Sequence, residues 1–422
     1  MSIRLIQCVI TDPKRFHDVG CNSRLSRDCP VRCLIVKLSS MGDVIHALPV
    51  VHDILHAYPQ AQIDWVVEEA FAELVSAHAG VHQVLPIGLR RWQKNWLSRQ
   101  HWWEFSQFKQ QLQQDAYDFV FDLQGLAKSA LIARWARKVR VAAQPATGKS
   151  YGFAAAAAKE PWSRYWIDSP LPINTRLPLI EQLRSVPAQA LSYTVRGKPE
   201  FGLQVPERYL QVRLPVPLGP SQAYAILLHG TAAAYKLWPP QAWRSLAKAL
   251  HQLGMATVLP WGNEAEHQRA KAIAANIPSA HVMPERYSIL QWAAWMQGAR
   301  VVIGLDTGLS HLAAALAVPT IFLFGATPHW RIAPYWGQSR HNELNRPGAD
   351  AATPAGGAAR PARHITLGQP EQQRWPTVKE VLQALAQLPL NSIEQSLSSQ
   401  PVLSQASTGL TPLILPGGSV SE

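Results

Sequence analysis

Two spacings of apolar residues alternate along the chain. The run at 31–36 is apolar apart from Arg32, which is typical of a buried strand in a parallel sheet. From Val44 to Leu55 apolar residues recur every three or four positions, which predicts one buried helix face that ends near Pro59. The alternation continues with predicted strands at 62–67, 81–87 and 119–122 and a helix from Leu126. Strands that alternate with helices indicate an α/β fold with a parallel sheet.

A second alternation of the same kind follows in the other half of the chain. The pattern predicts strands at 224–229, 257–260, 301–305 and 320–324, and helices at 240–252, 264–275, 288–298 and 309–317. Two α/β halves of similar size predict two domains with a cleft between two open sheets. Ligands of such sheets bind beyond the carboxyl ends of the strands, so the loops there are where chemistry is expected.

Composition places the boundaries around these halves. Residues 196–222 are rich in Pro and Gly, and both ends of the chain lack a regular apolar period. We expect an extension at 1–30, a first domain at 31–195, a linker at 196–222, a second domain at 223–345, a loop at 346–370, a helix within 371–390 and a disordered tail at 391–422.

The charge balance favours an anionic partner. Lys and Arg number 40 against 28 Asp and Glu, which gives a formal net charge of +12. Such a balance suits a phosphorylated substrate, a membrane surface or nucleic acid, and charge does not choose among them. The 16 Trp residues cluster near basic residues, which suits a membrane-interface enzyme, although core packing explains many single Trp positions.

Other classes of protein are disfavoured. No stretch of 18 apolar residues and no signal-peptide core are present, so we expect neither a transmembrane helix nor export from the cytoplasm. The four cysteines all lie within the first 33 residues at spacings that match no zinc motif. We therefore expect no metal site and free thiols.

The loop at 37–43 is the first candidate for chemistry. It joins a predicted strand to a helix, and Asp43 lies where that helix begins. A carboxylate there can accept a proton from an attacking hydroxyl, or it can simply cap the helix. Both interpretations stay open on this loop alone.

Two loops of the second half suit a bound anion. The segment 306–311, DTGLSH, opens a helix whose free N–H groups attract an anion, and Thr307 and Ser310 add hydroxyls; a capped helix is the alternative. Thr231 and Lys236 lie after the strand at 224–229 and could bind phosphate oxygens, whereas a solvated surface lysine is the alternative. No dinucleotide or Walker fingerprint accompanies these loops.

A basic belt runs through the first domain. Residues 85–150 hold eleven Lys or Arg against four Asp or Glu, interleaved with Trp near Arg90 and Arg91. This composition suits anionic headgroups and phosphorylated sugars, or a nucleic-acid backbone, or an ordinary solvated surface.

Seven short motifs in order resemble one family. They are VKLSSMGDVIHALP at 36–49, WVVEE at 65–69, RRW at 90–92, DLQGLAKS at 122–129, KLWP at 236–239, LPWG at 259–262 and DTGLSH at 306–311. Together they resemble the ADP-heptose:lipopolysaccharide heptosyltransferases of glycosyltransferase family 9, and among these the type I enzymes. The resemblance spans about residues 31–390. Three departures are Ala232, where the family usually has a second Thr, the first-domain His…Glu-Arg helix, whose nearest equivalent is taken to be Arg176, and the Ala-rich stretch at 151–159.

The resemblance implies a GT-B fold, with two Rossmann-like domains facing across a cleft and a C-terminal helix that crosses back to the first domain. The first domain would bind the acceptor and the second ADP-heptose. Asp43 would be the catalytic base and Lys236 would stabilise the leaving diphosphate. The sugar-donor contacts would come from Thr231, Lys236, Glu266 (with Glu264 as a rival at the ribose), Tyr287 near the adenine, Asp306, Thr307, Gly308, Leu309, Ser310 and His311.

The acceptor implied by the resemblance is a Kdo sugar of Kdo-lipid A. Its contacts would come from Lys37, Ser40, Arg90, Arg91 and Lys128. The enzyme would invert the anomeric centre and need no metal or other cofactor. It would work as a monomer on the cytoplasmic face of the inner membrane, without a nucleic-acid partner.

Two other functions compete with this prediction. One is a later ADP-heptose transferase of type II, which would act on an acceptor that already carries a heptose. The other is a non-catalytic basic protein that binds membrane or nucleic acid, for which the charge pattern is the only support.

Overall fold

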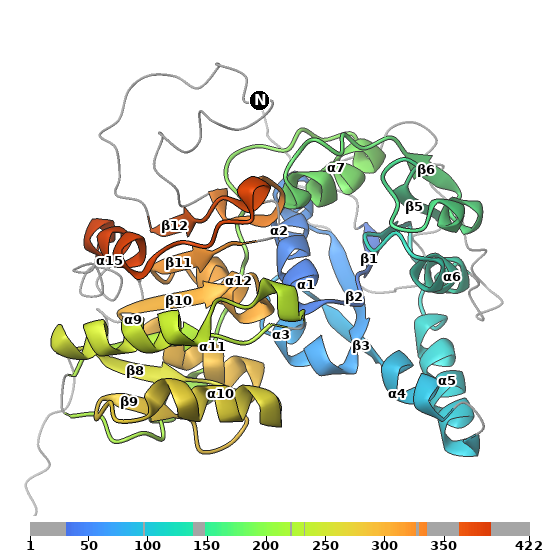
Figure 1. The fold of residues 1–422 in the computed structure, drawn as a ribbon. Helices are drawn as coiled ribbons and strands as arrows, with labels where there is room; N and C mark the ends of the chain where they lie inside the picture. Colours follow the sequence, from blue (N-terminus) through green and yellow to red (C-terminus); the bar gives the residue numbers. More distant parts are fainter. Residues whose placement is uncertain are drawn as a thin grey trace, which may run out of the picture.

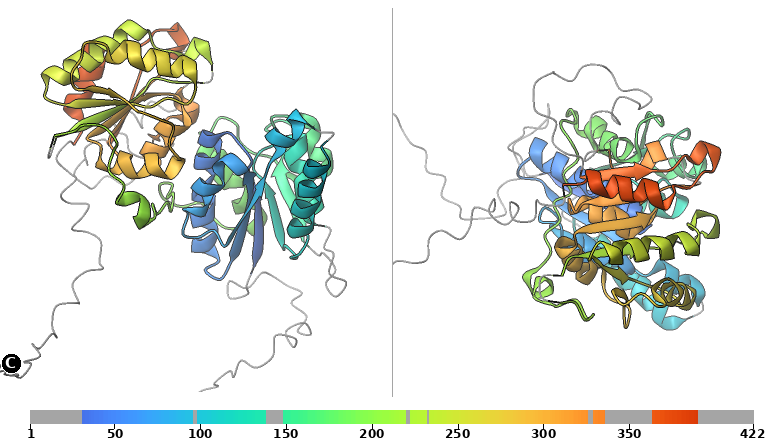
Figure 2. Two further views of the ribbon diagram at one scale, coloured as in Figure 1. Left: turned by 90° about the horizontal axis from the view of Figure 1, so that it is seen from below. Right: turned by 60° about the vertical axis from the view of Figure 1, so that its left-hand side comes forward.

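The structure, a computed structural model, describes residues 31–95, 98–137, 148–219, 222–231, 233–325, 329–335 and 363–389. The predicted extension at 1–30 and the predicted tail at 391–422 lie outside these residues, as does Ala232. The described chain forms two α/β domains, each with a parallel sheet between layers of helices (Figures 1 and 2). The predicted α/β class with two Rossmann-like halves is confirmed.

The first domain is built on a sheet of six parallel strands in the order β3-β2-β1-β4-β5-β6. Its strands are β1 (Arg32–Val36), β2 (Gln62–Glu68), β3 (Gln83–Ile87), β4 (Phe119–Asp122), β5 (Lys149–Phe153) and β6 (Ser169–Leu171). Its helices are α1 (Met41–Ala47), α2 (Pro49–Ala57), α3 (Ala72–Ser76), α4 (Leu89–Lys94), α5 (Arg99–Leu112), α6 (Ala127–Ala136) and α7 (Leu179–Leu191), with the 3₁₀ helices η1 (Glu69–Phe71) and η2 (Pro161–Trp166).

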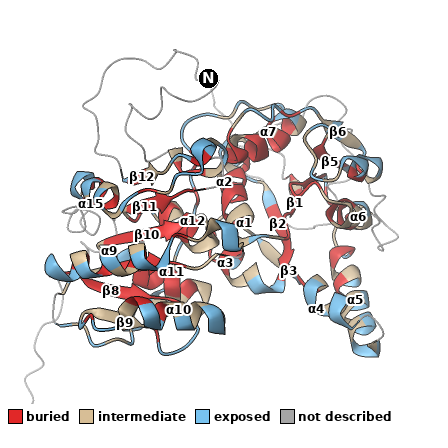
Figure 3. Ribbon diagram, in the orientation of Figure 1, coloured by how far each residue is buried: buried red, intermediate tan, exposed pale blue. Residues whose placement is uncertain are grey.

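Strand β1 shows why most of its sequence is apolar. Cys33 and Ile35 face the cluster that contains residues of α1, α2 and α7, while Leu34 and Val36 face the cluster that contains residues of α5 and α6. Because helices cover both faces of the strand, the four positions from Cys33 to Val36 are buried and apolar, while Arg32 at the start of the strand stays partly exposed (Figure 3).

The second domain repeats the same strand order. Its sheet reads β12-β11-β10-β7-β8-β9, which is again the order 3-2-1-4-5-6 when its strands are counted from β7. The strands are β7 (Tyr224–Leu228), β8 (Ala256–Leu259), β9 (Ala280–Val282), β10 (Val301–Leu305), β11 (Thr320–Leu323) and β12 (His364–Leu367). The helices are α9 (Pro240–Gln252), α10 (Glu264–Ala274), α11 (Ile289–Gly298), α12 (Gly308–Ala315), α13 (His329–Ile332) and α15 (Val378–Gln387), with η3 (Ala234–Lys236) and η5 (Pro370–Gln372).

The strand order determines where loops gather. In each sheet the second and third strands are added on one side of the first strand and the fourth to sixth on the other side, so the order of strands switches between β1 and β4 in one domain and between β7 and β10 in the other. The loops at the carboxyl ends of these two strand pairs therefore face a crevice at the switch point of each sheet. The three loops predicted to carry the base and the anion-binding residues, at 37–43, 229–236 and 306–311, all lie at these switch points.

The two domains share one apolar cluster. Helix α1 packs against α12, and α11 packs against α3 and α8 (Glu207–Leu210). The cluster includes Val44 and Leu48 from the first domain and Leu312 and Trp292 from the second. Because these side chains are buried together, the domains meet through a packed interface as well as through a linker.

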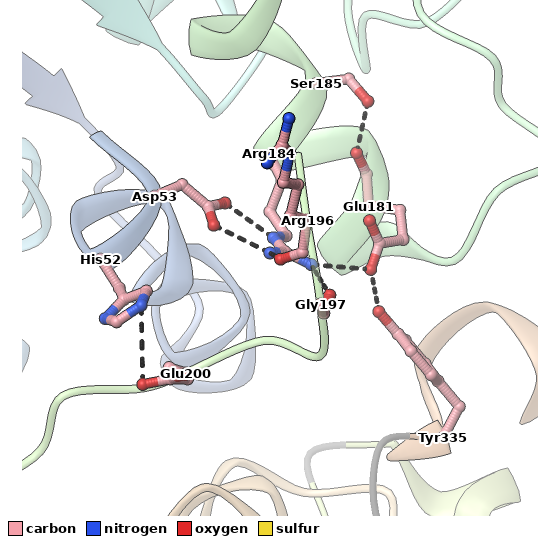
Figure 4. Close-up of polar contacts among 9 residues, drawn as sticks. All are labelled: His52, Asp53, Glu181, Arg184, Ser185, Arg196, Gly197, Glu200 and Tyr335. Atoms are coloured by element: carbon pink, nitrogen blue, oxygen red, sulfur yellow. Dashed lines mark hydrogen bonds and ion pairs between the residues drawn. The ribbon is translucent and has the colours of Figure 1, made fainter. Parts of the chain in front are cut away.

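A buried arginine fastens α7 to α2. Arg184 donates from Nε and Nη2 to the two carboxylate oxygens of Asp53, at 2.7 and 2.8 Å, and from Nη1 to Glu181 at 3.2 Å (Figure 4). Tyr335, from the segment after α13, donates to the same Glu181. The network therefore joins the helices behind α1 to a segment of the second domain.

Arg176, taken from the sequence as the equivalent of the family's first-domain Glu-Arg helix, lies outside this network. The two side chains that pair on one helix are Glu181 and Arg184, one turn apart on α7. Arg176 lies exposed in the loop before the helix and does not take this place. The sequence analysis predicted no helix at 179–191, because Pro178 directly precedes α7 and Pro187 lies inside it.

Three other expectations about the segments are corrected. The C-terminal helix α15 packs on α9, β11 and β12, and its Val381, Ala384 and Leu385 join the core of the second domain, so it does not cross back to the first. The predicted loop at 346–370 contains strand β12, which pairs with β11. The predicted linker contains α8, and its Leu203 forms a β-bridge with His78.

Candidate active site

A cavity of about 360 Å³ opens where the two domains face each other. Its first-domain lining comes from the start of α1, and its second-domain lining from the loops after β7 and β10. The lining residues are Ser40, Met41, Gly42, Asp43, His46, Thr231, Ala233, Lys236, Asp306, Thr307, Gly308, His311 and Ile332. The cavity thus brings the predicted base, Asp43, together with Thr231, Lys236 and the start of the 306–311 loop, which were predicted to bind the sugar donor.

Asp43 lies in the first turn of α1, where it both caps the helix and faces the cavity, so the two interpretations of the sequence are compatible. Its Oδ2 accepts the backbone N–H of Ser40 at 3.4 Å, as a helix cap would, and it also lines the cavity. The ammonium of Lys159, from the loop after β5, donates to the same oxygen at 2.9 Å. Burial by itself raises the pKa of Asp43, but the charges of Lys37 and Lys159 outweigh it and hold that pKa below its ordinary value. The carboxylate is therefore ionised at neutral pH.

The sugar-donor side of the cavity is held by a chain of three charged or polar side chains. Lys236 Nζ donates to Asp306 Oδ2 at 2.8 Å, and the other Asp306 oxygen lies 3.3 Å from His311 Nε2. Burial raises the pKa of Asp306, but His311 and Lys236 outweigh it and lower the pKa to about 2. The result is a fixed cation beside the amino end of α12, where helix N–H groups lack partners within the helix.

Two helix ends meet at close range across the cavity. A Cβ on Gly308 would lie 2.7 Å from Met41, and a Cβ on Gly42 would lie 3.2 Å from His311. Both positions therefore need the smallest side chain for α1 and α12 to approach in this way. His46 Nε2 lies 3.2 Å from His311 Nδ1 and joins the two helices by a buried hydrogen bond.

The comparisons with known proteins agree with this geometry. The family model described as glycosyltransferase family 9 (heptosyltransferase) matches residues 105–353. A lipopolysaccharide heptosyltransferase 1 of Pseudomonas aeruginosa is 40% identical over 298 residues, which cover 70% of this chain and 79% of the relative. The chain belongs to glycosyltransferase family 9.

Solved family 9 structures share the two-domain arrangement. The E. coli heptosyltransferase WaaC with ADP is 32% identical, with a TM-score of 0.66 over 87% of this chain and 99% of that one. The same enzyme with ADP-2-deoxy-2-fluoro heptose gives a TM-score of 0.63 over the same shares of the two chains. The fold of this family 9 chain is therefore GT-B.

Glu266 rather than Glu264 lies at the sugar-donor side. Its Oε2 accepts the backbone N–H of Gly262 at 2.7 Å, and a Cβ on Gly230 would lie 2.6 Å from its Oε1. Gly230 directly precedes the cavity-lining Thr231, so the Glu266 carboxylate lies against the loop that carries Thr231. Glu264 is largely exposed and pairs with Gln268 at 2.5 Å.

Three other predicted sugar-donor residues, Tyr287, Leu309 and Ser310, are not among the residues that line the cavity. Tyr287 packs edge-on against Trp295, with ring centroids 4.8 Å apart, outside the residues that line the cavity. Leu309 packs in the shared apolar cluster. Ser310 is buried and its hydroxyl donates to the carbonyl of Leu305 at 2.7 Å, so the structure does not support a sugar-donor contact through that hydroxyl.

Lys37 lies beneath the site instead of in it. The side chain is 1% exposed, and its ammonium donates to the carbonyl of Leu123 at 2.8 Å. Burial lowers the pKa of Lys37 to about 8. A direct acceptor contact is therefore not supported, and the residue instead acts on Asp43 through its charge.

The arginines predicted for the acceptor lie at the margin of the site. Both begin α4, which follows β3 at the same sheet edge, and neither is among the cavity-lining residues. Arg91 is held by Glu69 at 3.1 Å and Glu104 at 2.7 Å, and the Arg90 guanidinium lies 5.7 Å from the centre of the Phe71 ring. Ser40 lines the cavity, and Lys128 is partly exposed in the first turn of α6.

Sequence reasoning missed two functional candidates. Lys159 follows an Ala-rich stretch that departs from the family pattern, and the adjacent Lys159-Glu160 pair after this apolar run was the only signal. Glu160 fixes this loop by accepting the backbone N–H of Ala127 at 2.7 Å. His46 sits on an apolar helix face, where a histidine gives no sign of a partner 265 positions away. Among the described residues no group of three or more His, Cys, Asp or Glu forms a candidate metal site.

Proposed function

We propose that this chain transfers L-glycero-D-manno-heptose from ADP-heptose to a Kdo residue of Kdo-lipid A, with inversion at the anomeric carbon. One observation carries the proposal: the Asp43 carboxylate and the Lys236–Asp306–α12 cradle line the same interdomain cavity. The names of the relatives support the sugar and its nucleotide, since one is a lipopolysaccharide heptosyltransferase and another is seen with an ADP-heptose analogue.

The reaction is a single displacement. The acceptor hydroxyl oxygen attacks the anomeric carbon of the heptose as the bond from that carbon to the diphosphate oxygen breaks. Asp43 takes the hydroxyl proton, because it is ionised and faces the cavity. The new glycosidic bond forms on the opposite face from the departing ADP, which inverts the centre.

The departing ADP gains charge that the second domain can stabilise. Lys236 supplies an ammonium and the first N–H groups of α12 supply aligned dipoles, so both act on the diphosphate where charge develops. The Asp306 carboxylate holds the lysine in place before the donor arrives. Glu266, beside Gly230, is placed for the ribose hydroxyls.

We further propose that the cradle replaces a metal ion. A lysine and a helix end already supply positive charge at the diphosphate. Transfer is expected to stay within about twofold of its normal rate when EDTA is added, measured by ADP release. A large loss that Mg²⁺ restores would contradict this part of the mechanism.

The location of the enzyme follows from its proposed acceptor. A Kdo-lipid A acceptor places the reaction at the cytoplasmic face of the inner membrane, where the protein would be peripheral and monomeric. None of the helices in the described part of the chain is long and apolar enough to span a bilayer.

Product analysis tests the proposal. Purified protein is incubated with ADP-heptose and either Kdo-lipid A or the same acceptor already bearing one heptose, and the lipids are analysed by mass spectrometry. We expect one heptose to be added to Kdo-lipid A only. Addition only to the heptosylated acceptor would indicate the later, type II step, and no addition to either would contradict the proposed function.

A further inference from the structure

Four large aromatic side chains are exposed on the side of the first domain that faces away from the second. Trp102 and Trp103, at the start of α5, are 59% and 64% exposed, and Trp162 and Tyr165, on η2, are 53% and 70% exposed. Helix α6 packs against both α5 and η2, so the two groups belong to one helical layer. In Figure 1 α4, α5 and α6 lie along the right-hand edge of this domain. We call the outer surface of α4, α5, α6 and η2 the aromatic face.

The exposed rings stand on a packed aromatic base. Trp102 meets Phe105 edge-on at 6.2 Å between centroids, and Phe105 meets Trp135 of α6 at 5.3 Å. Trp162 meets Trp166 at 5.5 Å. These contacts hold the rings in place although the side chains stay exposed, and Figure 3 colours much of α5 as exposed. Exposing such rings is unfavourable unless something apolar covers them.

Two cavities lie on the same layer and differ in chemistry. One, of about 220 Å³, is lined by Leu89, Trp92, Gln93, His101, Trp102 and Phe105, and so is mostly apolar. The other, of about 290 Å³, is lined by Arg134, Arg137, Tyr165, Trp166, Ile167 and Asp168. The first suits hydrocarbon and the second suits an anionic headgroup, since Arg134 adds a cation that the Arg137–Asp168 ion pair does not neutralise.

The charge of the layer is strongly one-sided. Helices α4, α5, α6 and η2 carry eight Lys or Arg and a single carboxylate, Glu104. That carboxylate is already held by Arg91 at 2.7 Å and by the Trp92 indole at 2.8 Å. Aromatic rings at a polar–apolar boundary together with a surplus of cations are the combination that binds anionic bilayers.

We propose that the aromatic face docks on an anionic lipid bilayer. The proposal deepens the proposed function and rests on it, because a lipid acceptor must reach Asp43 from a membrane. Helices α4 and α6 begin at the carboxyl ends of β3 and β4, the same sheet edge from which α1 carries Asp43. The end of the aromatic face at which α4 and α6 begin therefore lies at the same sheet edge as Asp43.

Vesicle sedimentation of the full chain tests the docking. The vesicles are phosphatidylcholine with about 30% phosphatidylglycerol, or phosphatidylcholine alone. We expect the wild-type protein to bind the anionic vesicles, and the double variant Trp102→Ser/Trp103→Ser to partition at least about tenfold less. Leu253→Ser, which removes an equally exposed apolar side chain from the second domain, is the matched control and should bind like the wild type.

The electrostatic part of the docking is tested with a second variant. Arg99→Gln/Arg134→Gln removes two exposed cations of the aromatic face. This double variant should bind anionic vesicles at least about tenfold more weakly and leave binding to phosphatidylcholine unchanged. Equal binding of the wild type to both kinds of vesicle, or unchanged binding of the Trp variant, would overturn the proposal.

Two further measurements separate membrane docking from catalysis and from self-association. Transfer to a water-soluble, deacylated acceptor should stay within about twofold in Trp102→Ser/Trp103→Ser, whereas transfer to vesicle-embedded acceptor should fall. If the wild type transfers no heptose at all, the proposed function fails and sedimentation still decides the docking. A wild-type dimer that the Trp variant converts to a monomer, with no vesicle binding, would assign the face to a second copy and overturn the proposal.

Discussion

Asp43 illustrates how strongly neighbouring charges control a single carboxylate. Burial raises the pKa of Asp43, and the ammonium groups of Lys37 and Lys159 lower it further than burial raises it. A carboxylate with a low pKa is always ionised but is a weak base. The Lys159 side chain is partly exposed where it pairs with Asp43, whereas Lys37 is buried. An anionic acceptor that draws Lys159 away would therefore strengthen the base at the moment it is needed.

The pH profile of kcat/KM tests this control. Asp43 must be ionised to act, so the rate falls on the acid side as pH drops through its pKa, which lies below the ordinary value. In Lys159→Met one stabilising cation is lost, the pKa of Asp43 rises, and the acid limb is expected to move to higher pH. Lys248→Met, which removes an exposed lysine from α9, is the control and should leave the limb in place. An acid limb that stays at the same pH in Lys159→Met would show that this lysine does not set the base.

For single residues, the sequence analysis correctly predicted site residues that lie where a strand leads into a helix. Asp43, Lys236 and Asp306 were predicted there, and the cavity brings all three together. The roles of Lys159 and His46 could not be predicted, because each depends on a partner more than 100 positions away. The burial of Lys37 was equally hidden, since it follows from the carbonyl of Leu123 on the neighbouring strand loop.

At the scale of elements, apolar runs predicted the central strands and missed several others. Strand β10 and residues 33–36 of β1 are buried on both faces, so these stretches are continuously apolar. Strands β5 and β6 hold polar or proline residues, because they lie toward the sheet edge where fewer faces are covered. The C-terminal helix α15 was found, but its docking partner was not, since an amphipathic period does not say which core receives the apolar face.

Helix α7 depends on a buried ion pair that can be tested directly. Arg184→Met leaves the Asp53 carboxylate buried without its partner, which is expected to cost about 3–5 kcal/mol of unfolding free energy. The double variant Asp53→Leu/Arg184→Met removes both charges and should recover most of this loss. Urea unfolding followed by circular dichroism gives both values. A loss below about 1 kcal/mol in the single variant would show that the pair is not a main support of α7.

At the scale of the whole molecule, two sheets of the same strand order face each other through α1 and α12. Their switch points supply the base from one domain and the diphosphate cradle from the other. His46 and His311 join these helices, and burial lowers the pKa of His46 well below its ordinary value, so His46 is neutral. On the other side of the His311 ring, Nε2 lies 3.3 Å from Asp306 Oδ1, so the imidazole bridges His46 and Asp306. This hydrogen bond acts together with the shared apolar cluster and the contact of Tyr335 with Glu181 to hold the two domains in register.

Removing the His46–His311 hydrogen bond should disturb the alignment of the two domains without weakening nucleotide binding. His46→Leu keeps the site apolar but loses the bond to His311, so the base and the cradle are held less well in register. We expect kcat to fall about tenfold or more, while the Kd of ADP, measured by calorimetry, stays within about threefold. Unchanged kcat, or a loss confined to ADP affinity, would show that the pair does not align the domains.

The mechanism depends most directly on Asp43 acting as the base opposite a separate nucleotide cradle. Its test is single-turnover transfer by Asp43→Asn, with ADP-heptose binding measured by calorimetry on the same preparation. We expect the donor Kd to stay within about threefold and the transfer rate to fall by about 10²–10⁴-fold. Transfer near the normal rate in this variant, with donor binding intact, would contradict the role of Asp43 as the base.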